Sequence, residues 1–156
     1  MDADERARLR TVADYQFGGG AGRTLFPDDE ALTVVRSSSG RPQQVLAPGP
    51  DGGRRLVSYT VEGRLTLSVD GGRRLLSELG RPVAAVGEES EPFVRDGKNA
   101  FAKFVRRVDG DVRPGDEVCV TSDGALLAVG RAELHADGMR DFETGVAVKV
   151  REGAEA

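Results

Sequence analysis

The sequence has 156 residues, of which 31% are charged and 38% hydrophobic, and its formal net charge is −4. Its single cysteine, Cys119, excludes an internal disulfide and a zinc site built on several cysteines, and we expect neither a metal nor a cofactor. No apolar run approaches the roughly 20 residues that a membrane span needs, and no signal-peptide pattern opens the chain, so we expect a folded cytoplasmic protein without membrane contact.

Residues 1–81 predict a small α+β domain that begins with a helix. Asp2, followed three residues later by Glu5, is typical of a capping box, and the segment to about Asp14 then has an apolar face. The glycine-rich run at 18–23, GGGAGR, lacks the Lys-Ser/Thr ending of a phosphate loop and follows a helix rather than a strand. We therefore predict a flexible turn there, and no small-molecule substrate.

Short strands separated by Gly, Pro and Ser turns follow this run. The predicted strands are 32–36, 44–46, 55–61 and 65–69. The hexapeptide DGGRRL occurs at 51–56 and again at 70–75, but no longer period supports a repeat. Its second copy opens a helix through Leu79 that Gly80 ends, and Pro82 marks a domain boundary.

Residues 82–153 predict a second domain, followed by a tail at 154–156. Ser90 is placed to cap a short helix that Gly97 ends, and Asp137 to cap a helical turn that packs Met139 and Phe142. The strands are predicted at 82–86, 100–108, 117–121, 126–134 and 146–151. Five or six short strands with two helical turns describe a small, partly open barrel, so the whole chain is of the α+β class.

A cluster of positive charge stands out in the second domain. Five basic side chains and one acidic side chain lie between Arg95 and Arg107, whereas residues 82–156 hold 10 basic and 15 acidic residues in all. A local positive surface on an acidic protein predicts binding of a polyanion, with RNA or DNA the usual partner. Lys103 and Arg106 cannot share one face of a regular strand, so a bulge or a patch that wraps an edge is needed.

Other residues that could carry chemistry are given a structural interpretation. Phe93, Phe101 and Phe104 could stack on bases, but in so small a barrel we predict that they belong to the core. His135 has no acid or thiol partner nearby and is predicted in a surface turn. Cys119 has no activating neighbour in sequence, so we predict a semi-buried, unreactive thiol.

Three segments of the second domain resemble a PUA domain, the RNA-binding fold of pseudouridine synthases and archaeosine transglycosylases. They are PFVRDGKNAFAKFV at 92–105, VRPGDEVCV at 112–120, and LLAVGRAEL at 126–134 with the strand that follows Gly145. The first domain resembles the one that precedes PUA in the archaeal tRNA-guanine transglycosylase of archaeosine synthesis, through DYQFG at 14–18 and LFP at 25–27. The resemblance therefore covers nearly the whole chain.

The resemblance implies a protein that binds tRNA or another structured RNA, is not an enzyme, and assists tRNA modification. The family's catalytic barrel, with paired aspartates and a zinc site, has no counterpart in the sequence. In PUA domains the loop after the first helix approaches the RNA, and the match places Gly97, Lys98, Asn99 and Ala100 there. With the nearby basic residues, the candidate RNA-binding set is Arg95, Gly97, Lys98, Asn99, Ala100, Lys103, Arg106, Arg107, Lys149 and Arg151.

Two alternatives remain open at this point. The chain could be the non-catalytic subunit of a split transglycosylase whose barrel is a separate polypeptide, which predicts an apolar patch on residues 1–81. It could instead be a PUA adaptor in ribosome assembly or translation that acts through protein contacts.

Overall fold

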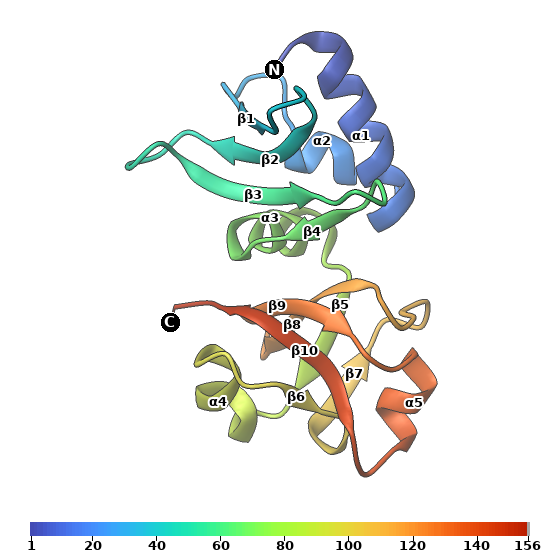
Figure 1. Cartoon of the computed structure of the whole chain (residues 1–156). Coiled ribbons are helices and arrows are strands. Elements are labelled where there is room, and N and C mark those ends of the chain that lie inside the picture. The colour runs from blue at the N-terminus through green and yellow to red at the C-terminus, as the bar shows by residue number, and fades with distance from the viewer. Residues whose placement is uncertain (156) are drawn as a thin grey trace. The chain divides into compact units, whose positions relative to one another are not determined.

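The computed structural model describes residues 1–155, which form two compact units, Met1–Leu79 and a second unit that begins at Gly80 (Figure 1). Of the predicted tail, residue 156 lies outside the described residues. Both units mix helices with a sheet, so the predicted α+β class is confirmed. None of the helices described here is long and apolar enough to cross a membrane.

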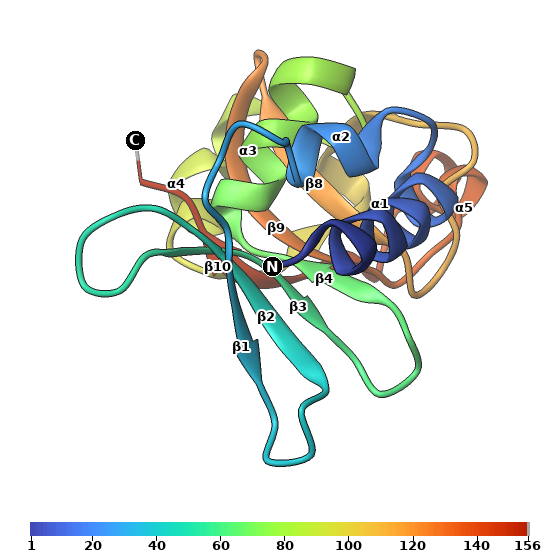
Figure 2. The ribbon, with the colours of Figure 1, turned by 90° about the horizontal axis from the view of Figure 1, so that it is seen from above.

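The first unit packs three helices against a four-stranded antiparallel sheet (Figure 2). The helices are α1 (Ala3–Phe17), α2 (Ala21–Leu25) and α3 (Val69–Leu79). The strands lie in chain order in the sheet: β1 (Thr33–Arg36), β2 (Pro42–Ala47), β3 (Arg54–Tyr59) and β4 (Leu65–Leu67). Its core is formed by fully buried side chains such as Leu25, Phe26, Leu56, Leu67 and Leu75.

Helix α1 begins as predicted, because the Asp2 carboxylate accepts a hydrogen bond from the Glu5 N–H at 2.8 Å. The buried Glu5 carboxylate binds the Arg36 guanidinium of the edge strand β1, with N–O distances of 2.6 and 2.8 Å. The helix continues three residues beyond the predicted end, because the Gln16 amide bonds both backbone groups of Leu65, at 2.7 and 2.8 Å.

The glycine-rich run is only partly the flexible turn that the sequence predicted. Gly18 ends α1 with φ +105°, and α2 begins at the buried Ala21. Gly22 lies inside α2, and a Cβ atom there would collide with the backbone of Arg10. This glycine therefore lets two helices approach closely, which is a packing role.

The second unit is a six-stranded mixed sheet with two short helices, the near-barrel that the sequence predicted (Figure 1). Its strands are β5 (Val83–Val86), β6 (Ala100–Phe101), β7 (Val105–Val108), β8 (Glu117–Ser122), β9 (Ala125–Ala132) and β10 (Val146–Gly153). They lie in the order β6-β10-β9-β8-β5-β7, with β5 and β8 parallel and the other pairs antiparallel. The helices are α4 (Glu91–Arg95) and α5 (Ala136–Asp141).

The single strand predicted at 100–108 is wrong. A 3-10 turn at Ala102–Phe104 divides it into β6, which pairs with β10, and β7, which pairs with β5. These partners lie at opposite edges of the sheet, so one straight strand could not reach both. The turn also removes the conflict between Lys103 and Arg106, since the two residues belong to different elements.

Two predicted helix caps are also wrong. His135, not Asp137, caps α5, because its Nδ1 accepts a hydrogen bond from the Gly138 N–H at 2.9 Å. Ser90 stands at the cap position of α4, but its hydroxyl makes no capping bond. A 3-10 turn at Glu88–Ser90 runs directly into α4 and holds Ser90 in a helical conformation, whereas a capping residue needs an extended one. Phe142 is 51% exposed, so only Met139 of the predicted pair is core.

The Glu5–Arg36 ion pair gives the first unit a specific sensitivity to acid. Hydrogen bonding to Arg36 holds the pKa of Glu5 below its ordinary value, so the carboxylate stabilises the fold above about pH 4.5 and loses this contribution as the pH falls through the lowered pKa. We expect Arg36→Met to lower the free energy of unfolding at pH 7, because it leaves the buried Glu5 carboxylate without its partner. The difference from the unsubstituted protein should shrink in acid.

The measurement is urea unfolding followed by tyrosine fluorescence, because both tyrosines, Tyr15 and Tyr59, belong to the first unit and the chain has no tryptophan. Arg23→Met, which removes an exposed arginine with no ion pair among residues 1–155, is the control. A loss of stability that is the same at pH 7 and pH 3 would contradict the assignment.

Candidate nucleic-acid interface

The loop after α4 is shaped by a glycine that reverses the chain direction. Gly97 has φ +93°, and its N–H bonds the Val94 carbonyl while the Lys98 N–H bonds the Phe93 carbonyl, both at 3.0 Å. This pair of bonds is a Schellman motif, and it confirms the prediction that Gly97 ends the helix. A Cβ at Gly97 would have no atom within 4 Å, so the outer side of the loop is open.

The next two residues attach the loop to the sheet. The Asn99 side-chain oxygen accepts a hydrogen bond from the Val150 N–H of β10 at 3.1 Å. Ala100 pairs with Val148 and is 1% exposed. Ala100 therefore has a core position, and Asn99 fixes the loop while its amide nitrogen bonds none of residues 1–155.

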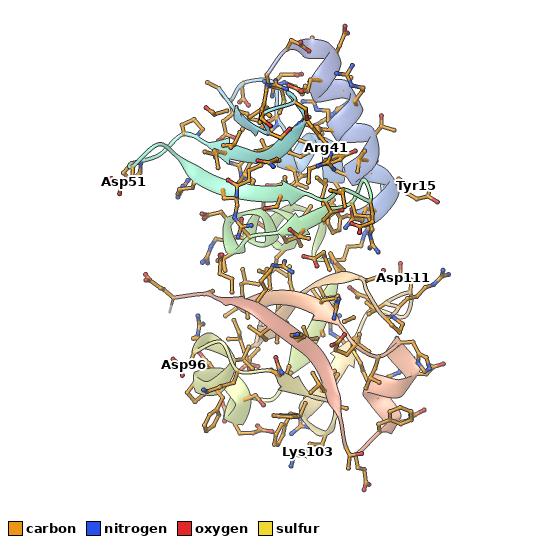
Figure 3. All side chains as sticks on the ribbon, in the orientation of Figure 1. Tyr15, Arg41, Asp51, Asp96, Lys103 and Asp111 are labelled. Atoms are coloured by element: carbon orange, nitrogen blue, oxygen red, sulfur yellow. The ribbon has the colours of Figure 1, made fainter. Side chains whose placement is uncertain are left out.

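Two candidate lysines are free to bind an anion. Lys98 follows the glycine, and Lys103 lies in the 3-10 turn between β6 and β7, where Figure 3 shows it projecting from the protein. Both are exposed, and within residues 1–155 neither forms an ion pair. The Lys103 ammonium lies 5.0 Å from the centroid of the Phe104 ring.

The candidate arginines of the same stretch are already engaged. Arg95 bonds Glu91 at 3.1 Å and the carbonyls of Ala154 and Glu155 at 3.0 Å each, so it holds the end of the chain against α4. Arg106 pairs with Glu89 at 2.8 Å, and Arg107 lies 3.8 Å from Asp109. The positive potential of the cluster is therefore smaller than its composition suggests.

The two candidates on β10 differ in the same respect, since the arginine is bound to a carboxylate and the lysine is not. Arg151 binds Glu117 of β8, which is only 6% exposed, through both terminal nitrogens of its guanidinium. Lys149 is exposed, faces Arg131 of β9 in register, and forms no ion pair among the described residues. It stands next to Val150, the strand residue that Asn99 holds.

The three phenylalanines predicted for the core line a groove instead. Phe93 is 63% exposed and Phe101 44% exposed, and with Phe104 they border a groove of about 620 Å³. The core itself is filled by Val, Ala, Leu and Met side chains. The two-residue strand β6 accounts for this, because Phe101 follows the buried Ala100 and successive strand residues face opposite sides. The full lining is Glu89, Ser90, Phe93, Val94, Lys98, Asn99, Phe101 and Phe104.

The surroundings of Cys119 and His135 indicate that both residues serve the fold. Burial raises the pKa of the Cys119 thiol to about 12, helped by the negative charges of Glu117 and Asp109. His135 is used as a helix cap. Among the described residues no three His, Cys, Asp or Glu side chains form a group that could hold a metal ion.

Comparison with protein families matches both units. Residues 7–82 match the patch-forming domain C2 of tRNA-guanine transglycosylase, and residues 82–154 match the PUA domain. The tRNA-guanine(15) transglycosylase of Thermococcus kodakarensis is 40% identical over 97% of this chain and 26% of the relative. That of Methanothermobacter thermautotrophicus is 43% identical over 96% and 23%. The chain thus spans about a quarter of the length of the curated relatives it matches, in their C-terminal region.

Solved structures share the fold. A hypothetical protein of Pyrococcus horikoshii superposes with a TM-score of 0.74 at 18% identity, over 100% of this chain and 93% of that one. A conserved PUA domain protein of Thermoplasma acidophilum gives 0.70 at 24% identity, over 98% and 91%. At these identities the likeness shows the fold alone.

The burial of Cys119 leads to a chemical prediction. Because the thiol is buried and protonated at neutral pH, we expect iodoacetamide to leave it unmodified in the native protein and to alkylate it fully in urea, as mass spectrometry would show. Rapid alkylation under native conditions would show that β8 opens to solvent.

Proposed function

Because the chain belongs to the archaeal tRNA-guanine transglycosylase family, with that enzyme's C2 domain joined to a PUA domain, we propose that it binds tRNA without itself catalysing base exchange. The relatives that it matches are named for a reaction on tRNA. The matched region is their C-terminal part, and we propose that the exchange reaction belongs to a catalytic body outside these residues. A tRNA ligand also fits the cytoplasmic location expected from the sequence.

The observation that carries this proposal is the pair of free lysines beside an open glycine loop. Lys98 and Lys103 are exposed and form no ion pair within the described part of the chain, whereas Arg95 and Arg106 near them are bound to carboxylates. Because a Cβ at Gly97 would have no atom within 4 Å, the backbone of this loop is open to the approach of a phosphate. The ammonium groups of Lys98 and Lys103 would neutralise the charge of the phosphate. Contacts of this kind recognise the shape and backbone of an RNA helix.

Removal of the two lysines tests the proposal directly. We expect Lys98→Ala with Lys103→Ala to weaken binding to total tRNA about tenfold in dilute salt, and to reduce the slope of log K against log salt by about 1.5, since two phosphate contacts are lost. Gel shifts across a salt series measure both quantities.

The matched control is Arg8→Ala with Arg113→Ala, which removes the same charge from two exposed arginines outside the loop. Binding that is unchanged by the lysine substitutions, or lowered equally by the control, would overturn the proposed site.

A second candidate function is that of the RNA-binding, non-catalytic subunit of a split transglycosylase. Two exposed apolar side chains in the first unit favour it. Tyr15 is 94% exposed and projects from the end of α1 (Figure 3), and Val61 in the β3–β4 turn is 83% exposed. The bonds from Gln16 to Leu65 bring these two segments together. A transglycosylase truncated before its C2 domain should then regain guanine exchange when this chain is added, and Tyr15→Ser should abolish the rescue.

A further inference from the structure

Helix α5 begins with a histidine cap, and this histidine is the only one in the chain. The His135 Nδ1 accepts a hydrogen bond from the Gly138 N–H at 2.9 Å. Helix caps are usually Asn, Asp, Ser or Thr, whose side-chain oxygens accept this bond in mild acid as well as at neutral pH. An imidazole accepts it only while it is neutral, because the imidazolium ion has a proton on both ring nitrogens.

The first turn of α5 depends on this bond. Gly138 is buried, and a Cβ there would lie 3.3 Å from the His135 Cε1 and 3.3 Å from the Phe142 Cε2, so the imidazole rests directly against the turn. The first N–H groups of a helix have no partner within the helix. A protonated ring would set a second donor against the Gly138 N–H, and it would add positive charge at the positive end of the helix.

Helix α5 in turn supports the 3-10 turn that carries Lys103. It packs against that turn and against β7. Met139 of α5 and Ala102 of the turn are 0% and 2% exposed, and both belong to the same hydrophobic core. After α5 the chain returns to the turn, where the Gly145 carbonyl accepts a hydrogen bond from the Ala102 N–H at 3.0 Å. A change in α5 therefore reaches the residue next to Lys103.

The charged side chains around His135 do not change their charge where an imidazole does. Asp111 and Arg113, from the loop between β7 and β8, and Asp137 of α5 line a pocket of about 250 Å³ with His135, and Asp137 is paired with Arg140 at 2.6 Å. Carboxylates and guanidinium groups ordinarily keep their charge between about pH 5.5 and 7.5, whereas histidine titrates in this range. The N-terminal amino group, which also titrates near neutral pH, belongs to the first unit.

We propose that His135 is a positioning residue through which RNA binding responds to pH. The neutral imidazole caps α5, and α5 holds the turn so that Lys103 meets the RNA. Protonation removes the cap, loosens α5 and weakens the contact. This inference rests on the RNA binding proposed above and adds that binding weakens in mild acid. That direction is opposite to the effect of an added positive charge, which by itself strengthens binding to a polyanion.

Three proteins at two pH values test the proposal, with fluorescently labelled total tRNA in dilute salt and anisotropy as the measurement. From pH 7.5 to pH 5.5 we expect the Kd of the unsubstituted chain to rise about threefold, in line with the modest contribution of one cap. His135→Asn, whose side-chain oxygen caps without titrating, should match it at pH 7.5 and keep that affinity at pH 5.5. His135→Ala should bind more weakly at both. Unchanged or tighter binding of the unsubstituted chain at pH 5.5 would overturn the proposal.

A further variant tests the route through Lys103. If loosening of α5 acts on this lysine, Lys103→Ala should lower the affinity for tRNA and also remove the loss of affinity in acid, because two changes that act on one contact are not additive. A threefold loss in acid that persists in Lys103→Ala would show that the pH acts elsewhere, which contradicts the assignment.

Nuclear magnetic resonance without RNA separates failure of this inference from failure of the proposed function. Because His135 is the only histidine, its ring gives one titration curve, and the Gly138 amide resonance should follow that curve in the unsubstituted chain and stay constant in His135→Asn. If tRNA binds but the Gly138 amide does not follow the ring, the function stands and the role of His135 is refuted. If tRNA binds at neither pH, the proposed function fails, and this inference fails with it.

Discussion

The arrangement of the candidate interface depends on the close contact between the end of α4 and the end of β10. Arg95 bonds the carbonyls of Ala154 and Glu155, and Gly153 leaves room for the Arg95 backbone, because a Cβ at that position would collide with its carbonyl oxygen. In the loop that follows α4, Asn99 bonds Val150 of β10. The glycine loop is thus held on one side by the residues that end β10 and follow it, and on the other side by Val150 within β10, which fixes the position of Lys98.

The two kinds of basic residue are used differently in this chain. Its 22 basic side chains include three lysines, Lys98, Lys103 and Lys149, and all three are exposed without an ion pair among residues 1–155. Many arginines instead hold the fold together, as Arg36 does with Glu5 and Arg151 with Glu117. The planar guanidinium suits two-pronged bonds to carboxylates, whereas the ammonium is a mobile point charge. In so arginine-rich a sequence, the rare lysines are therefore the better indicators of a surface left open for a ligand.

Much of the fold was predictable from local signals, because each depends on neighbouring residues. The Asp2 cap, the Gly97 turn and the alternating strands of both sheets are of this kind. The division of the strand at 100–108 was not, since periodicity does not reveal that β6 and β7 have partners at opposite edges of one sheet. The site was predictable as a loop but not as a groove. Pairing of Arg106 with Glu89, and burial of the Ser90 hydroxyl without a partner among residues 1–155, arise only when distant segments meet.

The division into β6 and β7 also bears on how copies of the protein behave beside one another. These two strands are the outer members of the six-stranded sheet, and they contain only two and four residues. An outer strand with a long row of unpaired N–H and C=O groups invites a neighbouring chain to add a strand, which is a common route to aggregation. Edge strands this short offer few unpaired backbone groups to an incoming strand. Addition of a strand from a second copy is therefore disfavoured at both edges of this sheet.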